Sequence, residues 1–272
     1  MTPRQRALGA LAAGVLGLTL LASVASADHV WGNVSGAYHW ARTSNPFTLQ
    51  LGDNVGSAWD SYLRTASTDW SVSSVLDTSV VAGKAGTSCT AQTGRAEVCA
   101  KKYGRTGWLG VAQIWISSNH ITKGLVKMND TYFGMSTYNK PTWRALVMCQ
   151  EIGHIFGLDH QDENFSNTPL GTCMDYSSDP NPNQHPNAHD YEMLEEIYAH
   201  LDTTTTLVQS TSSNKGKNQD DLGDDPTHWG REVRRSSDGR ASLFELELGG
   251  NDSVFTHVFW AEPRERESRN SR

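Results

Sequence analysis

Alternation of apolar and polar residues predicts several strands in the first two thirds of the chain. The alternating runs are 74–81, 108–116 and 124–129. Helical spacing occurs at 58–63 and over 141–156, where Pro141 is suited to the first helical turn. The order of helix, strands, helix, loop and helix is typical of an α+β domain whose sheet packs on long helices. We expect this domain to span 28–201.

The pattern changes after this domain. Residues 202–225 are mostly small and polar, which predicts a linker that cannot bury a core. Alternation then returns at 231–234, 243–248 and 254–260, with Gly-rich turns between the runs. These runs predict a small three-strand region over 226–262. Such a sheet has little stability alone, so we expect it to pack on the main domain or on a partner. A charged tail, expected to be disordered, follows at 263–272.

The first residues have the features of a signal peptide. Two arginines precede an apolar run at 7–24, and Ala25 and Ala27 form a small-residue cleavage site. We therefore expect residues 1–27 to be removed and the mature protein to be secreted and extracellular. An uncleaved anchor helix is the alternative, but the apolar run is short for crossing a bilayer. After cleavage we expect no membrane association.

Composition narrows the function classes further. The 30 acidic residues exceed the 23 basic ones and give a formal net charge of −7, which disfavours nucleic acid as a partner. The nine Trp and eight Tyr favour an ordered core over a disordered chain. We expect a monomer.

Four cysteines remain in the exported chain, where thiols oxidise readily. They are Cys89, Cys99, Cys149 and Cys173, and three pairings are possible. Pairing Cys89 with Cys99 would close a short polar loop. A zinc site of four cysteines is the alternative, but no two cysteines have the C-x-x-C spacing typical of such sites.

The most informative segment is 149–160. Gln150 and His154 are four residues apart and so share one face of the predicted helix. Gly157 permits a left-handed turn that ends the helix and returns His160 toward that face. Two or three ligands can then reach one metal ion. Glu151 is near enough to act on a water at the metal without binding the metal itself.

This segment resembles the metzincin zinc metallopeptidases, whose signature is H-E-x-x-H-x-x-G-x-x-H followed by a turn with a methionine. The matching positions are Glu151, His154, Gly157, His160 and Met174. The resemblance implies a metzincin-like (zincin) fold, with a twisted sheet on the active-site helix and a C-terminal helix at 187–198. It also implies a Zn²⁺ cofactor and a protein or peptide as substrate.

The resemblance assigns further roles. Tyr176 is similar to the tyrosine that astacin-like members place near zinc, so it is a candidate catalytic residue beside Glu151. The resemblance implies that a substrate strand pairs with a sheet edge, for which 109–112 is the best candidate. It also brings Cys149 and Cys173 together, and that disulfide would join the metal helix to the methionine turn.

One position departs from the family. Gln150 stands where the first zinc-binding histidine is expected, and an amide oxygen is a weaker zinc donor than imidazole. The metal ligands are then Gln150, His154 and His160, or Tyr176 completes the set, or the site binds metal poorly.

Two functions are compatible with these residues. The first is a secreted zinc endopeptidase with Glu151 as general base. The second is a catalytically inactive metzincin-fold protein that acts as an extracellular binding module, and Gln150 is the residue that separates the two.

Loops 159–167 and 179–183 could hold Ca²⁺, although solvated turns explain their composition equally well. The remaining histidines considered are expected to be structural or exposed: His39, His120, His185 and His189.

Overall fold

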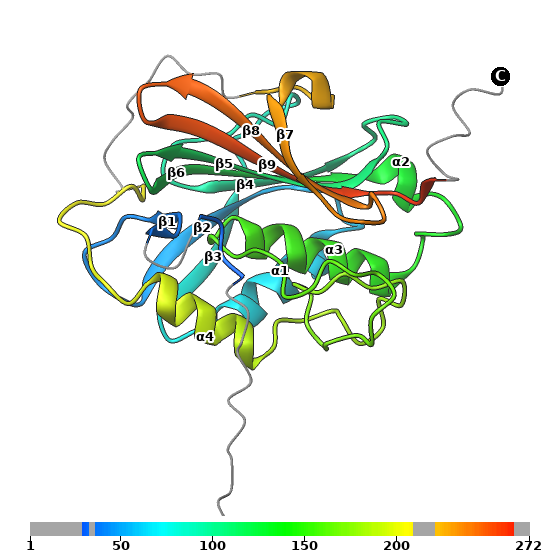
Figure 1. Ribbon diagram of the computed structural model, residues 1–272, viewed down its shortest axis with the longest axis horizontal. Coiled ribbons are helices and arrows are strands. Elements are labelled where there is room, and N and C mark those ends of the chain that lie inside the picture. The colour runs from blue at the N-terminus through cyan, green and yellow to red at the C-terminus, as the bar shows by residue number, and fades with distance from the viewer. Residues whose placement is uncertain (1–28, 33–35, 209–220, 264–272) are drawn as a thin grey trace, which may run out of the picture.

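The computed structural model describes residues 29–32, 36–208 and 221–263, which form one large twisted sheet with few helices (Figure 1). The strands are β1 (His39–Trp40), β2 (Phe47–Asn54), β3 (Leu76–Ala82), β4 (Ala96–Lys101), β5 (Trp108–Ser117), β6 (His120–Asn129), β7 (Arg231–Arg235), β8 (Ala241–Gly249) and β9 (Asp252–Trp260). The helices are α1 (Asp60–Trp70), α2 (Asp130–Phe133), α3 (Pro141–His154), α4 (Ala188–Ile197) and the short 3₁₀ helix η2 (Pro226–His228).

The sheet has the strand order β3, β2, β4, β6, β5, β9, β8, β7, and β1 pairs with β6 outside this path. Its first part is parallel, since β2 pairs in parallel with β3 and β4, and β4 with β6. From β6 to β7 every neighbouring pair is antiparallel. Figure 1 shows α1, α3 and α4 together on one face of the sheet.

Both faces of the central strand β5 are buried. Its side chains divide between two apolar clusters: Ile114 joins the main core beneath the sheet, whereas Trp108 and Trp115 belong to a second cluster on the opposite face. The main core includes Leu146 and Ile152 of α3, so this helix packs directly under the strand. Burial on both faces explains why 108–116, expected to alternate between apolar and polar residues, is instead apolar at almost every position.

The three C-terminal strands are not a separate small sheet. Strand β9 pairs antiparallel with β5 along its length, from Trp108 opposite Trp260 to Ser117 opposite Asp252. Strands β8 and β7 follow beyond β9. The stretch 109–112, expected to be an edge that receives a substrate strand, therefore lies between β6 and β9 and has no free edge. That expectation fails because β9, far away in sequence, supplies the backbone partners.

Both expected disulfides are present. Cys89 pairs with Cys99 and Cys149 with Cys173, at Cα–Cα distances of 6.2 and 5.9 Å. The first closes a short loop before β4, and the second joins α3 to the segment that carries Met174.

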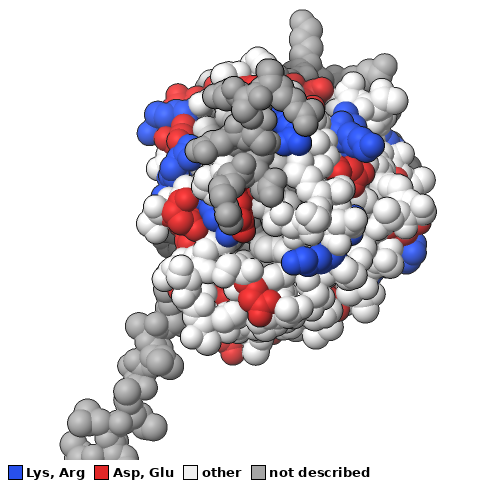
Figure 2. All heavy atoms as spheres, turned by 90° about the vertical axis from the view of Figure 1, so that its right-hand side faces the viewer, with Lys and Arg blue, Asp and Glu red and all other residues white. Residues whose placement is uncertain are grey.

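The signal peptide expected at 1–27 lies outside the described residues, as do 209–220 of the expected linker and most of the expected tail. Within the described ranges, no helix combines the length and apolarity that a membrane crossing requires. Figure 2 shows acidic and basic side chains intermixed on the face that it presents, in keeping with the modest net charge of −7.

Candidate metal centre

The end of helix α3 sets the position of the first two histidines. Pro141 occupies the first turn and Lys140 precedes it in an extended conformation, so the helix begins where the sequence predicts. It ends at His154, and Gly157 then adopts a φ of +101°, a conformation that L-residues rarely adopt. This turn brings His160 back against His154, with 4.5 Å between their ring centroids.

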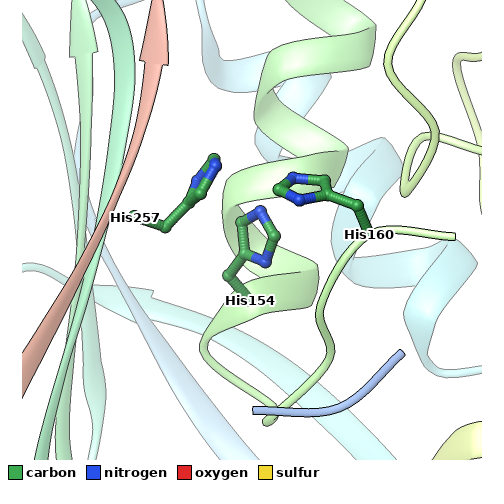
Figure 3. A group of neighbouring side chains, drawn as sticks. All are labelled: His154, His160 and His257. Atoms are coloured by element: carbon green, nitrogen blue, oxygen red, sulfur yellow. The ribbon is translucent and has the colours of Figure 1, made fainter. Parts of the chain in front are cut away.

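A third histidine comes from β9. The ring of His257 lies 4.0 Å from that of His154 and 4.6 Å from that of His160, measured between centroids. Each of the three residues offers a nitrogen, and these three atoms all lie within 4.8 Å of one another. Figure 3 shows the three rings converging from the helix, from the loop that follows it and from the strand.

Two buried nitrogen atoms in this cluster have no hydrogen-bond partner among the described residues. His154 Nδ1 lies 2.9 Å from the Leu158 carbonyl oxygen and donates to it, so Nε2 carries the free lone pair. That Nε2 and the Nε2 of His160 are the two atoms without a partner. Buried polar atoms are rarely left unsatisfied in proteins. A divalent cation that accepts imidazole nitrogens would satisfy them, so the donor set fits zinc.

Charged groups of the following loop surround His160. Its Nδ1 lies 3.3 Å from Asp159 Oδ1 and 3.5 Å from Glu163 Oε1. Burial lowers the pKa of His160, but these two carboxylates outweigh burial and leave its pKa raised. Arg234 of β7 contacts the same two acids, with Nη2 2.6 Å from Asp159 Oδ1 and Nε 3.2 Å from Glu163 Oε1. The C-terminal strands therefore also fasten the loop that carries His160.

Burial controls the protonation of the remaining groups. Burial, together with the neighbouring histidines, lowers the pKa of His154 and His257 well below the ordinary value, so both rings are neutral near pH 7. Neutral imidazole is the form that binds metals. Burial raises the pKa of Glu151 well above the ordinary value. A cation nearby would oppose this rise, because positive charge favours the carboxylate.

His257 also contacts the two candidate catalytic residues. Its Nδ1 lies 3.3 Å from Glu151 Oε2, and its Nε2 lies 2.6 Å from the Tyr176 hydroxyl oxygen. Glu151, Tyr176 and His154 have no exposed surface, and His257 is 1% exposed. His257 thus contacts both residues that are expected to act on a substrate, and all of these side chains are buried.

Gln150 lies in the same part of α3 but is held differently. Its Nε2 donates to the Cys173 carbonyl oxygen at 2.8 Å, and its buried Oε1 has no partner within the part of the chain that the structure describes. The Cys149–Cys173 disulfide fixes this region of the helix next to Met174. A Cβ added to Gly153 would lie 2.5 Å from Met174 Sδ, which shows that the methionine packs against the helix directly beneath the site. Coordination through Gln150 stays a prediction.

Sequence reasoning did not single out His257. The alternation over 254–260 predicts its strand, and position 257 shares a face with Phe255 and Phe259, which both join the main core. A histidine among apolar neighbours on one face of a strand was the available signal. Its partners could not be inferred, because the pairing of β9 with β5 is set by tertiary structure.

The loops considered for Ca²⁺ are held largely by their own hydrogen bonds. Asp175 accepts from Asn167, Asn183 and the backbone of Leu170, and Asp162 accepts from the backbone of Asn164. Calcium binding there stays a prediction.

No family model and no curated protein matches the chain. Among solved structures, the chain is similar to a crystal structure of myroilysin, with 15% sequence identity and a TM-score of 0.32. That match covers 68% of this chain and all of the myroilysin chain.

Proposed function

We propose that the protein is a secreted zinc-dependent endopeptidase whose metal ligands are His154, His160 and His257. The observation that supports this most is the convergence of three buried histidines, each of which offers a nitrogen within 4.8 Å of the other two. In this proposal His257 takes the place that Gln150 leaves open. Three protein nitrogens around a catalytic zinc, with one position left for water or substrate, are a common arrangement.

The chemistry divides between the ion and the chain. When bound, zinc supplies positive charge that polarises a peptide carbonyl and an attacking water. Glu151 accepts the proton of that water and transfers it to the leaving amine. The Tyr176 hydroxyl donates a hydrogen bond to the oxyanion that develops on the substrate. The low dielectric of the buried site strengthens both interactions.

The described arrangement is a closed form of this site. Strand β9 pairs with β5 in the antiparallel manner expected of a substrate strand, and it carries His257 between Glu151 and Tyr176. Because Glu151 and Tyr176 are fully buried beneath this pairing, a peptide cannot approach Glu151 in this arrangement. We therefore expect low basal activity.

Complete burial of the site favours a second candidate function. A metal ion enclosed by three histidines under a continuous sheet would serve stability, and the protein would then be a catalytically inactive binding module. The two candidates share the metal but differ in whether Glu151 acts on a substrate.

Zinc content and cleavage of an unfolded protein substrate, measured on the same purified chain, test the proposal. We expect Glu151→Gln to keep zinc and to lose chelator-sensitive cleavage, since the amide has the same shape but cannot accept the proton. We expect His257→Ala to lower zinc affinity. His185→Ala is the control, because the His185 side chain is 59% exposed and belongs neither to the proposed ligands nor to the candidate catalytic residues. Zinc binding without any cleavage that depends on Glu151 would favour the binding module, and wild-type zinc affinity in His257→Ala would overturn the ligand set.

A further inference from the structure

A second cluster of histidines lies where three distant segments meet. His39 belongs to β1, which pairs in parallel with β6 so that His39 lies opposite His120. His200 and Asp202 come from the segment that follows α4. Among the described residues, His39, His200 and Asp202 also form a group whose ligand atoms lie within 4.8 Å of one another. None of these residues contributes to the centre at α3.

The distances within this group match those between ligands of one metal ion. His39 Nε2 lies 3.1 Å from His200 Nε2 and 3.5 Å from Asp202 Oδ1, and His200 Nε2 lies 3.7 Å from the same oxygen. Ligands bound tetrahedrally to zinc at about 2.0–2.1 Å are separated by about 3.3 Å. The three atoms thus form a triangle of the right size around one ion.

Hydrogen bonds outside the triangle orient its donors. His39 Nδ1 donates to the Ala37 carbonyl oxygen at 2.8 Å, which leaves the Nε2 lone pair directed at the group. Asp202 Oδ2 accepts from Arg42, from Nη1 at 3.0 Å and from the backbone nitrogen at 3.1 Å, so Oδ1 remains for an ion. A histidine fixed by a carbonyl and a carboxylate fixed by a second donor are typical surroundings of metal ligands.

Access to this group differs from access to the centre at α3. His39 is 1% exposed, whereas the side chain of His200 is 54% exposed and that of His120 is 32% exposed. An ion can therefore enter from solvent and reach a buried ligand. His120 Nε2 lies 3.2 Å from Asp202 Oδ1, and its ring centroid lies 4.9 Å from that of His39, so His120 is the adjacent donor.

We propose that His39, His200 and Asp202 form a second binding site for zinc or a similar divalent transition metal, with His120 as the neighbouring fourth donor. Two imidazoles and one carboxylate suit zinc better than calcium or magnesium, which prefer oxygen ligands. The ion would tie β1, the start of β6 and the segment after α4 together. This proposal does not depend on the peptidase function.

Zinc stoichiometry and affinity, measured on the full chain by metal analysis and calorimetry, test the site. We expect two zinc ions in the wild-type protein and one in His200→Ala. In that variant we expect binding at this site to weaken at least about 100-fold, because removing a ligand exceeds the effect of disturbing its surroundings. Asp202→Asn keeps the shape of the side chain and should also lose one ion. His185→Ala, an equally exposed histidine outside both groups, should keep two.

Cobalt(II) provides a second readout, since a tetrahedral histidine and carboxylate site gives visible absorption bands. We expect His200→Ala to lose one of two sets of bands and His257→Ala to lose the other. If the centre at α3 binds no metal, the wild-type protein will hold one ion and His200→Ala none, which keeps the two proposals separate. Equal zinc content and equal affinity in His200→Ala and His185→Ala would overturn the second site and leave a hydrogen-bonded histidine cluster.

Discussion

Replacing Gly157 with alanine tests the turn that brings His160 to His154. The backbone of Gly157 has a φ of +101°, and its carbonyl oxygen accepts from the Trp31 backbone nitrogen at 2.9 Å. An added Cβ would lie 2.1 Å from the Tyr38 carbonyl oxygen. The Tyr38 oxygen belongs to the backbone, and the added Cβ would be bonded directly to the backbone. Rotating a side chain therefore cannot relieve the contact.

Two costs combine in this variant. A left-handed conformation costs an L-residue about 1–2 kcal/mol. Forcing an extra methyl group into a packed region costs about 1–3 kcal/mol more. Alanine also restricts the conformations of the unfolded chain, and this offsets about 0.4–1 kcal/mol of the destabilisation. We therefore expect Gly157→Ala to lower the free energy of unfolding by about 3 kcal/mol and the Tm by about 6–12 °C.

Gly104→Ala is the matched control. Gly104 also has a positive φ, +82°, but an added Cβ there would meet nothing within 4 Å. This control isolates the effect of the backbone conformation, which we expect to lower the free energy of unfolding by about 1 kcal/mol. Urea unfolding of the metal-free proteins, followed by tryptophan fluorescence and far-ultraviolet circular dichroism, measures both. If the two variants lose the same stability, the contact with Tyr38 does not constrain the turn and the reasoning is refuted.

Three further outcomes are expected. Removing the Cys149–Cys173 disulfide should lower the free energy of unfolding in urea by about 3.5 kcal/mol, because this disulfide closes the longer loop. Removing Cys89–Cys99 should lower it by about 2.8 kcal/mol. The opposite order of the two losses would contradict the loop-length explanation. Chelation should lower the Tm of the zinc-loaded protein by about 8–16 °C for each ion removed, if free zinc exceeded that site's Kd about 1,000-fold. An unchanged Tm would argue against metal binding in the folded state. Arg234→Gln should lower the free energy of unfolding by about 1 kcal/mol or less in low salt, since the Arg234 side chain is 40% exposed. This loss of stability should be smaller in high salt. A salt-independent loss would assign Arg234 a packing role instead.

The local parts of the site could be predicted from the sequence. Helix α3 begins at Pro141 as expected and ends at His154, two residues before the predicted end. Apolar periodicity, a proline at the start and Gly157 after the end are all properties of neighbouring residues, so the approach of His160 to His154 follows from spacing alone. The pairing of Cys149 with Cys173 followed from the resemblance to a family and is confirmed.

The rest of the site depends on contacts that no local pattern encodes. Alternation predicts a strand over 254–260 but cannot say which strand becomes its neighbour. The insertion of β9 between β5 and β8 both removes the expected edge at 109–112 and delivers His257. Similarly, His39 and Asp202 meet only because β1 pairs with β6 near the end of α4. Each histidine by itself was indistinguishable from a structural one.

The place of β9 in the sheet has a consequence for biosynthesis. A chain emerges from the ribosome with its N-terminal part first, so β5 is made long before the strand that covers it. Until residue 257 has emerged and β9 has docked, one backbone edge of β5 stays unpaired and the three-histidine group is incomplete. An unpaired strand edge readily pairs with other chains. Truncation before β9 should therefore yield aggregates, and the order of synthesis itself keeps the centre from being completed early.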